Sequence, residues 1–103
     1  ELKIRRDALV EGLRSINPEF RITGTHAGMH LVVSLSGWTP DIVEKLKKIA
    51  LGKGLAIFST VPYYSGVATQ PGLLMGYAST SVAEITRGLK ILKDAIRELE
   101  KSR

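Results

Sequence analysis

Residues 81–99, SVAEITRGLKILKDAIREL, decide the fold, because they contain the clearest helix signal of the chain. Ser81 and Glu84 have the spacing of a capping box, in which each side chain accepts a hydrogen bond from the other residue's backbone. Apolar residues then recur every three or four positions, which is the helical period. They are Val82, Ile85, Leu89, Leu92, Ile96 and Leu99. The segment therefore predicts a long C-terminal helix with one packing face.

Two more helices are predicted upstream of this one. The first spans about residues 2–16, where leucines recur on one side, and Pro18 ends it because the residue before a proline disfavours helical geometry. The second begins after Thr39, a favourable N-cap residue that proline and aspartate follow. Gly52 and Gly54 are predicted to let the chain leave the second helix in left-handed geometry.

Four short strands are predicted between the helices, at residues 20–25, 29–36, 55–59 and 73–78. Apolar residues occupy the odd positions of 29–36, as expected for a strand with one buried face. The first two strands are separated only by a small turn containing Gly28, which predicts an antiparallel pair. The strand at 55–59 is predicted to be buried.

The order helix-strand-strand-helix-strand-strand-helix predicts an α+β fold. The expected architecture is a two-layer sandwich, with a small, mostly antiparallel sheet and helices on one face. The 103 residues suffice for one domain, so residues 1–103 are predicted to form a single domain. Because the sequence begins at Glu1 without an initiator methionine or signal peptide, we expect it to be part of a longer protein.

Composition excludes several classes of function. The chain has no cysteine, which rules out disulfides, thiolate zinc sites and a cysteine nucleophile. No apolar run approaches the roughly 20 residues that a membrane span requires, so no membrane partner is expected. The net charge is +5, but acidic residues are interleaved with the basic ones and no aromatic platform accompanies them. Direct nucleic-acid binding by this segment is therefore not expected.

Motifs for catalysis or metal binding are missing from the sequence. His26 and His30 lie on either side of a glycine turn, and no third ligand follows at a metal-binding spacing. No phosphate-binding loop and no nucleophile elbow occurs. From the motifs alone, the chain could be a free-standing α+β interaction module.

Six segments, taken in order over about 95 residues, resemble one protein family. The segments are 5–9 (RRDAL), 27–33 (AGMHLVV), 54–58 (GLAIF), 61–64 (VPYY), 73–78 (LLMGYA) and 81–89 (SVAEITRGL). They resemble the C-terminal domain of pyridoxal-phosphate-dependent aminotransferases of fold type I. Within that family, the chain is most similar to the MocR-type branch of GntR transcriptional regulators and to the aminotransferases related to them.

The resemblance implies a C-terminal small domain of a longer cytoplasmic protein. Pyridoxal phosphate is then expected in the full-length parent and not in this fragment alone, because the lysine that binds it belongs to the missing large domain. The implied partners are that large domain, a second copy of the parent in a homodimer, and DNA, the last only through an N-terminal winged-helix domain outside this chain.

Leu74 is the most informative departure from the family pattern. The aminotransferases that the chain resembles have an arginine at this position, where a guanidinium can bind the substrate carboxylate with two hydrogen bonds. The leucine side chain has no hydrogen-bond donor and cannot make these two bonds. This difference favours an effector-sensing regulator, which is not catalytic as an isolated fragment. The alternative is the small domain of an active aminotransferase, and whether the parent is an enzyme stays open.

Six residues are predicted to face the cofactor or effector. Their places are the start of the second strand, the loop at 60–72 and position 74, where the chain departs from the family pattern. The six residues are Gly28, Met29, His30, Tyr63, Tyr64 and Leu74. No catalytic or metal-binding residue is predicted. The loop at 60–72 combines two tyrosines with prolines and glycines, and irregular segments of this length are often functional. Alternatively, the tyrosines pack over the end of the sheet.

Overall fold

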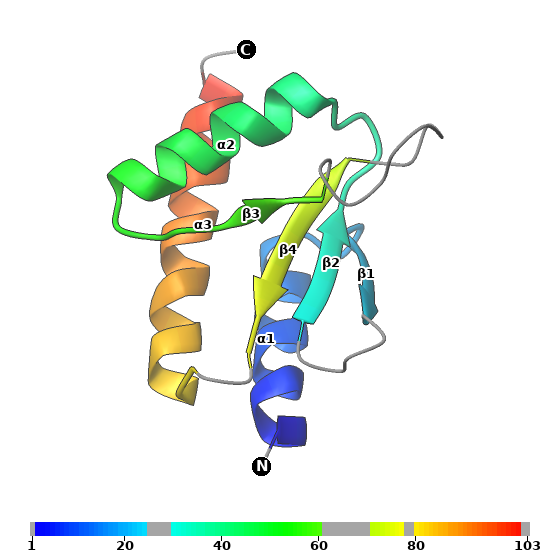
Figure 1. The fold of residues 1–103 in the computed structure, drawn as a ribbon, viewed down its shortest axis with the longest axis vertical. Coiled ribbons are helices and arrows are strands. Elements are labelled where there is room, and N and C mark those ends of the chain that lie inside the picture. Colours follow the sequence, from blue (N-terminus) through cyan, green and yellow to red (C-terminus); the bar gives the residue numbers. More distant parts are fainter. Residues whose placement is uncertain (1, 25–29, 61–70, 78–79, 102–103) are drawn as a thin grey trace.

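The computed structural model describes residues 2–24, 30–60, 71–77 and 80–101. Within these ranges the chain forms three helices and four strands in the predicted order (Figure 1). They are α1 (Leu2–Ile16), β1 (Arg21–Gly24), β2 (His30–Ser34), α2 (Pro40–Gly52), β3 (Phe58–Ser59), β4 (Gly72–Gly76) and α3 (Val82–Lys101). None of these helices has the length and apolar composition that crossing a membrane requires.

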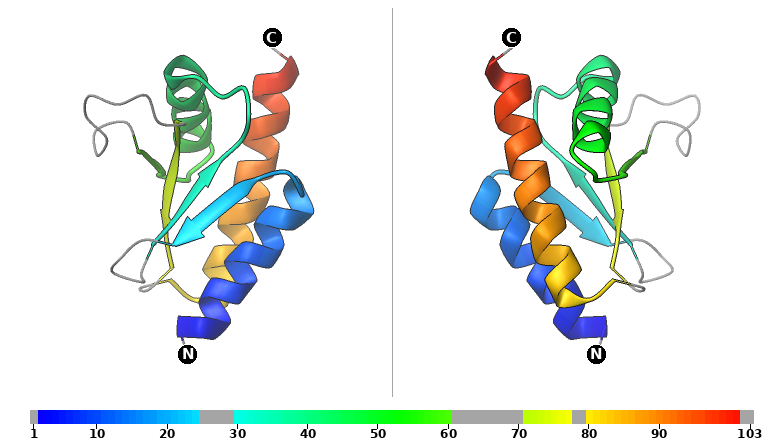
Figure 2. Two further views of the ribbon diagram at one scale, coloured as in Figure 1. Left: turned by 90° about the vertical axis from the view of Figure 1, so that its right-hand side faces the viewer. Right: turned by 90° about the vertical axis from the view of Figure 1, so that its left-hand side faces the viewer.

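The four described strands form one sheet in the order β1-β2-β4-β3, and every neighbouring pair is antiparallel. The central pair is β2 and β4, which run side by side from His30 opposite Gly76 to Ser34 opposite Gly72. Helices α1 and α3 lie together on one side of the sheet (Figure 2). Helix α2 contacts α3 and β3. The predicted two-layer α+β fold is confirmed.

The core lies between the α1–α3 pair and the sheet. Leu31, Val33 and Leu73 have no exposed surface, because alternate positions of β2 and β4 point toward the helices. The helices oppose them with leucines and small residues that are also buried. These are Leu9 and Leu13 of α1, Val43, Leu46 and Ala50 of α2, and Ile85, Leu92, Ala95 and Leu99 of α3.

Two positions of α3 differ from the predicted apolar stripe. Val82 is 42% exposed, because it begins the helix, one turn before the first buried residue, Ile85. Ala95 is fully buried although the predicted stripe did not include it; it follows Leu92 by three residues and so shares its helix face. Leu89 is half-buried and packs against α1, where a side chain at Gly12 would overlap its Cδ1 atom. The stripe is thus centred closer to Leu92 than predicted.

Both ends of α2 are set by local bonds. The Thr39 hydroxyl accepts a hydrogen bond from the backbone N–H of Ile42 at 3.2 Å, as predicted for an N-cap. At the other end, Gly54 has a φ of +98°, which confirms its predicted left-handed geometry. The same prediction for Gly52 is wrong: this residue belongs to the helix, and the C-cap residue is Lys53.

The strand predicted at residues 55–59 is much shorter in the structure. Within this segment, only Phe58 and Ser59, which form β3, pair with β4. The backbone N–H of Leu55 instead donates to Ala50 at the end of α2, at 2.9 Å, so the chain between them is fixed by the helix end. Phe58 is 61% exposed, since β3 is an edge strand. The prediction of a buried strand is therefore wrong at this position.

The capping box of α3 makes a testable contribution at acidic pH. The Glu84 carboxylate accepts hydrogen bonds from the Ser81 backbone N–H and hydroxyl, each at 3.1 Å. These bonds lower the pKa of Glu84 below its ordinary value of 4.5. A carboxyl with a lowered pKa stabilises the fold above its unfolded-state pKa and loses that contribution as the pH falls through the folded-state pKa. We therefore expect Glu84→Gln to flatten the fall of Tm with pH below about pH 5.

The measurement is the thermal midpoint from circular dichroism between about pH 3 and 7. Glu19→Gln removes an exposed carboxylate outside the capping box and serves as the control. If the two variants show the same pH profile, the capping box contributes nothing that depends on pH.

Candidate functional site

One row of side chains crosses the sheet on the face opposite to α1 and α3. Thr23 of β1 lies opposite Val32 of β2, Val32 opposite Leu74 of β4, and Leu74 opposite Phe58 of β3. Val32 and Leu74 are half-buried and Phe58 is 61% exposed. We call Val32, Leu74 and Phe58 the apolar row. It gives this open face of the sheet a hydrophobic centre.

The structure brings two of the predicted site residues onto this open face. His30 begins β2 opposite Gly76 and is exposed. It lies two residues before Val32, and Gly76 lies two residues after Leu74, so His30 and Leu74 project from the same face. The predictions for Gly28, Met29, Tyr63 and Tyr64 concern positions outside the described residues.

A cavity of about 160 Å³ adjoins Leu74. It lies between β4, the segment 55–58 and the first turns of α3, and its lining is mostly apolar. Two polar residues, Thr80 and Glu84, also contribute to the lining. The Glu84 carboxylate already accepts the hydrogen bonds of Ser81, so the cavity offers burial to an apolar group and little chemistry.

Sequence reasoning missed this cavity. Its cause is the shortness of β3, which leaves residues 55–57 beside β4 without ladder pairing. The one signal in the sequence is Gly88, where a side chain would come within 3.4 Å of Leu55. A glycine inside a predicted helix indicates a close approach of another segment, but does not identify that segment.

The open face has little positive charge. No lysine occurs between Lys53 and Lys90, and the described strands contain one arginine, Arg21, exposed on the edge strand β1. No described residue of the face could therefore supply an amine to a carbonyl cofactor. In the described ranges, no three histidine, aspartate or glutamate residues gather as metal ligands would. The site is an apolar wall with His30 beside it.

No protein-family model matches the chain, and no curated protein sequence matches it. Solved structures do match. Kynurenine aminotransferase from Pyrococcus horikoshii, in complex with PMP, KYN and KYA, is 27% identical over 93% of this chain, with a TM-score of 0.76. α-Aminoadipate aminotransferase from Thermus thermophilus, complexed with N-(5'-phosphopyridoxyl)-L-leucine, is 24% identical over 96%, with a TM-score of 0.77. Multiple substrate aminotransferase from Thermococcus profundus is 22% identical over 98%, with a TM-score of 0.79.

This chain spans only about a quarter of each of these proteins, 24% of the first and 25% of the other two. The match covers nearly all of this chain, 93–98% of it. It confirms the predicted resemblance to aminotransferases at the level of the fold, whereas the assignment to the MocR branch stays a prediction. The chain has an α+β fold that resembles part of these aminotransferases.

Proposed function

We propose that this chain is the C-terminal small domain of a longer protein, a MocR-type transcriptional regulator of the GntR family. In this proposal its aminotransferase-like part senses an effector and contains pyridoxal phosphate in the full-length parent. The length of the match supports the first point, since the solved aminotransferases are about four times as long as this chain. Two of them hold a PMP or phosphopyridoxyl group, which supports the cofactor.

Leu74 is the observation that favours a regulator. It lies at the centre of the open face, between Val32 and Phe58, where the resembling enzymes have an arginine. A guanidinium binds a carboxylate with two charge-assisted hydrogen bonds, and an isobutyl group cannot replace them. Val32 and Phe58, the residues opposite Leu74, provide no cation, and the one described strand arginine on this face, Arg21, lies on the edge strand β1. A site of this kind is suited to contact an apolar part of a ligand and unsuited to hold an amino-acid carboxylate for catalysis.

The described residues do not hold the cofactor by themselves. When bound in a protein, pyridoxal phosphate supplies an electron sink to an amino group attached to it. Binding pyridoxal phosphate requires an amine, groups that bind its phosphate and a partner for its pyridine ring. In this proposal, all three would come from the rest of the parent. This chain would supply the apolar row, which excludes water from one side of the site, and His30, an exposed hydrogen-bonding group at its border.

An active aminotransferase is the second candidate, because the solved structures that match the chain are named as aminotransferases. In that case another residue of the parent would bind the carboxylate. Under both candidates the proposed partners are the large domain and a second copy of the parent, in the cytoplasm. DNA would be bound only by the regulator, through its winged-helix domain.

The coding sequence upstream of Glu1 distinguishes these candidates. A winged-helix segment followed by a large cofactor domain supports the regulator. A cofactor domain alone supports the aminotransferase. An initiator methionine close to Glu1 would overturn both and leave a free-standing module.

Leu74→Arg tests the role of the apolar row in the parent. We expect the wild-type parent, mixed with pyridoxal phosphate and an amino acid, to convert the cofactor to its amine form much more slowly than the about 1 s⁻¹ or more typical of enzymes. The arginine variant should bind the amino acid at least about tenfold more tightly, because a charge-assisted pair contributes about 1.5–3 kcal/mol. Absorbance of the cofactor follows both quantities.

Leu74→Met is the matched control, since it keeps an apolar side chain of similar size. It should leave amino-acid affinity unchanged. Wild-type conversion at an enzyme's rate would overturn the regulator proposal. Equal affinities for the arginine and methionine variants would show that position 74 does not meet the carboxylate.

A further inference from the structure

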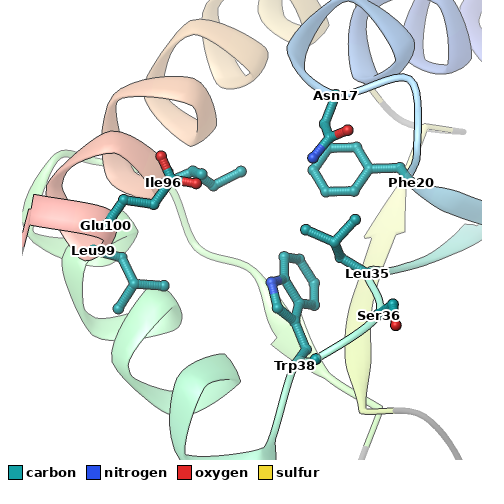
Figure 3. Close-up of a pocket in the computed structure, with 9 residues that line it drawn as sticks. Asn17, Phe20, Leu35, Ser36, Trp38, Ile96, Leu99 and Glu100 are labelled. Carbon is teal, nitrogen blue, oxygen red and sulfur yellow. The ribbon is translucent and has the colours of Figure 1, made fainter. Parts of the chain in front are cut away.

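A second pocket lies on the other side of the molecule, where the end of α3 approaches the two turns that precede β1 and α2. Its volume is about 90 Å³. Figure 3 shows Ile96, Leu99 and Glu100 of α3 on one side of the pocket and Phe20, Leu35 and Trp38 on the other. None of these six residues belongs to the open face of the sheet.

Two aromatic rings form a fixed wall of this pocket. The rings of Phe20 and Trp38 pack edge to face, with centroids 5.9 Å apart. Both residues are largely buried, at 2% and 8% exposed. Arg14 donates hydrogen bonds to the backbone carbonyls of Pro18 and Phe20, which holds the turn containing Phe20 in place. The wall therefore exists before any ligand binds.

The one charged side chain among the pocket's described lining residues is negative. It belongs to Glu100, and the other polar lining residues, Asn17 and Ser36, are neutral. Among the described residues, the Glu100 carboxylate makes no ion pair and no hydrogen bond, whereas Glu98, two residues earlier, pairs with Lys53 at 3.2 Å. The last turn of α3, which also contains Lys101, brings the negative end of the helix dipole to this site. Aromatic faces, a carboxylate and a helix C-terminus all favour a cation.

We propose that this pocket binds a small organic cation, a primary alkylammonium with a short apolar chain. The ammonium group pairs with the Glu100 carboxylate, and the carbon chain lies against Leu35 and Trp38. The volume of about 90 Å³ suits a short apolar chain of about four carbons. This proposal does not depend on the proposed function, because the site is separate from the apolar row.

The chain's single tryptophan reports on the pocket directly, because Trp38 is part of its wall. The purified chain is titrated with n-butylammonium, 1-butanol and butyrate at constant ionic strength, while Trp38 fluorescence and the indole N–H resonance are recorded. The three probes have nearly the same shape and differ in charge. For so few atoms we expect a Kd on the order of 1–10 mM for n-butylammonium. Butanol should bind at least about tenfold more weakly, and butyrate not measurably.

Glu100→Gln and Glu98→Gln are the matched variants, since they remove neighbouring carboxylates of the same helix. Glu100→Gln should reduce the affinity for n-butylammonium to that for butanol. Glu98→Gln should leave it within about twofold of wild type, because that carboxylate pairs elsewhere. Circular dichroism confirms that both variants fold. Equal binding of n-butylammonium and butanol, equal losses in the two variants, or no saturable signal by either readout would overturn the proposal.

Discussion

Leu92→Ala is expected to lower the free energy of unfolding by about 2–5 kcal/mol, the usual cost of removing a fully buried leucine side chain. Leu92 has no exposed surface and lies on α3, which packs against both α1 and α2. Replacing Leu92 by alanine leaves a cavity next to α3, which packs against α1 and α2. The surrounding side chains cannot fill this cavity unless whole helices move. For a domain of this size, the thermal midpoint should fall by roughly 10–30 °C.

Leu51→Ala is the control, since it makes the same chemical change on α2 at a side chain that is 64% exposed. Its effect should stay within about 0.5 kcal/mol. Urea unfolding followed by circular dichroism measures both variants. A loss below about 0.5 kcal/mol for Leu92→Ala would mean that α3 does not form the core described above.

The helices could be predicted from the sequence because their signals are local. The apolar period within 81–99 and the capping residues Ser81 and Thr39 act within one or two turns, and the structure confirms them. Burial at each position was less predictable. The exposure of Val82 and the burial of Ala95 depend on where other elements pack against α3, which no local pattern contains.

The strands were predicted less well, because pairing depends on residues far apart in the chain. The segment 55–59 is apolar enough for a strand, but only Phe58 and Ser59 reach β4, while Leu55 is bonded to the end of α2. Alternation places His30 and Val32 on one face of β2. Only the register with β4 brings Leu74 beside them.

The two pockets could not have been predicted. Phe20, Trp38 and Glu100 meet at the second pocket, and their separation in the sequence leaves no spacing to recognise. The cavity beside Leu74 arises because β3 ends early, which is itself a tertiary effect. The sequence therefore identifies the elements and the family resemblance, whereas the binding surfaces depend on how the elements meet.

Gly72→Ala is expected to destabilise the protein by about 1–3 kcal/mol, the usual range for overpacking a filled site. A Cβ atom at Gly72 would lie 2.6 Å from the backbone carbonyl oxygen of Val33, which belongs to the neighbouring strand β2 and cannot rotate away. Gly72 is also bonded on its other side, donating to the Thr60 hydroxyl and accepting from the Thr60 backbone N–H, both at 3.0 Å. The start of β4 therefore cannot move away from β2 and toward β3 without compressing these bonds.

Gly52→Ala provides the matched control because it should change stability in the opposite direction. A Cβ atom at Gly52 would have no neighbour within 4 Å, and the residue lies in α2 with a φ that any residue can adopt. Alanine there should stabilise the fold by up to about 1 kcal/mol, since glycine loses more chain entropy in a helix. Thermal unfolding of the two variants should give shifts of opposite sign. A neutral or stabilising effect of Gly72→Ala would mean that β2 and β4 do not approach as closely as their register requires. The placement of Leu74 beside Val32 would then also be wrong.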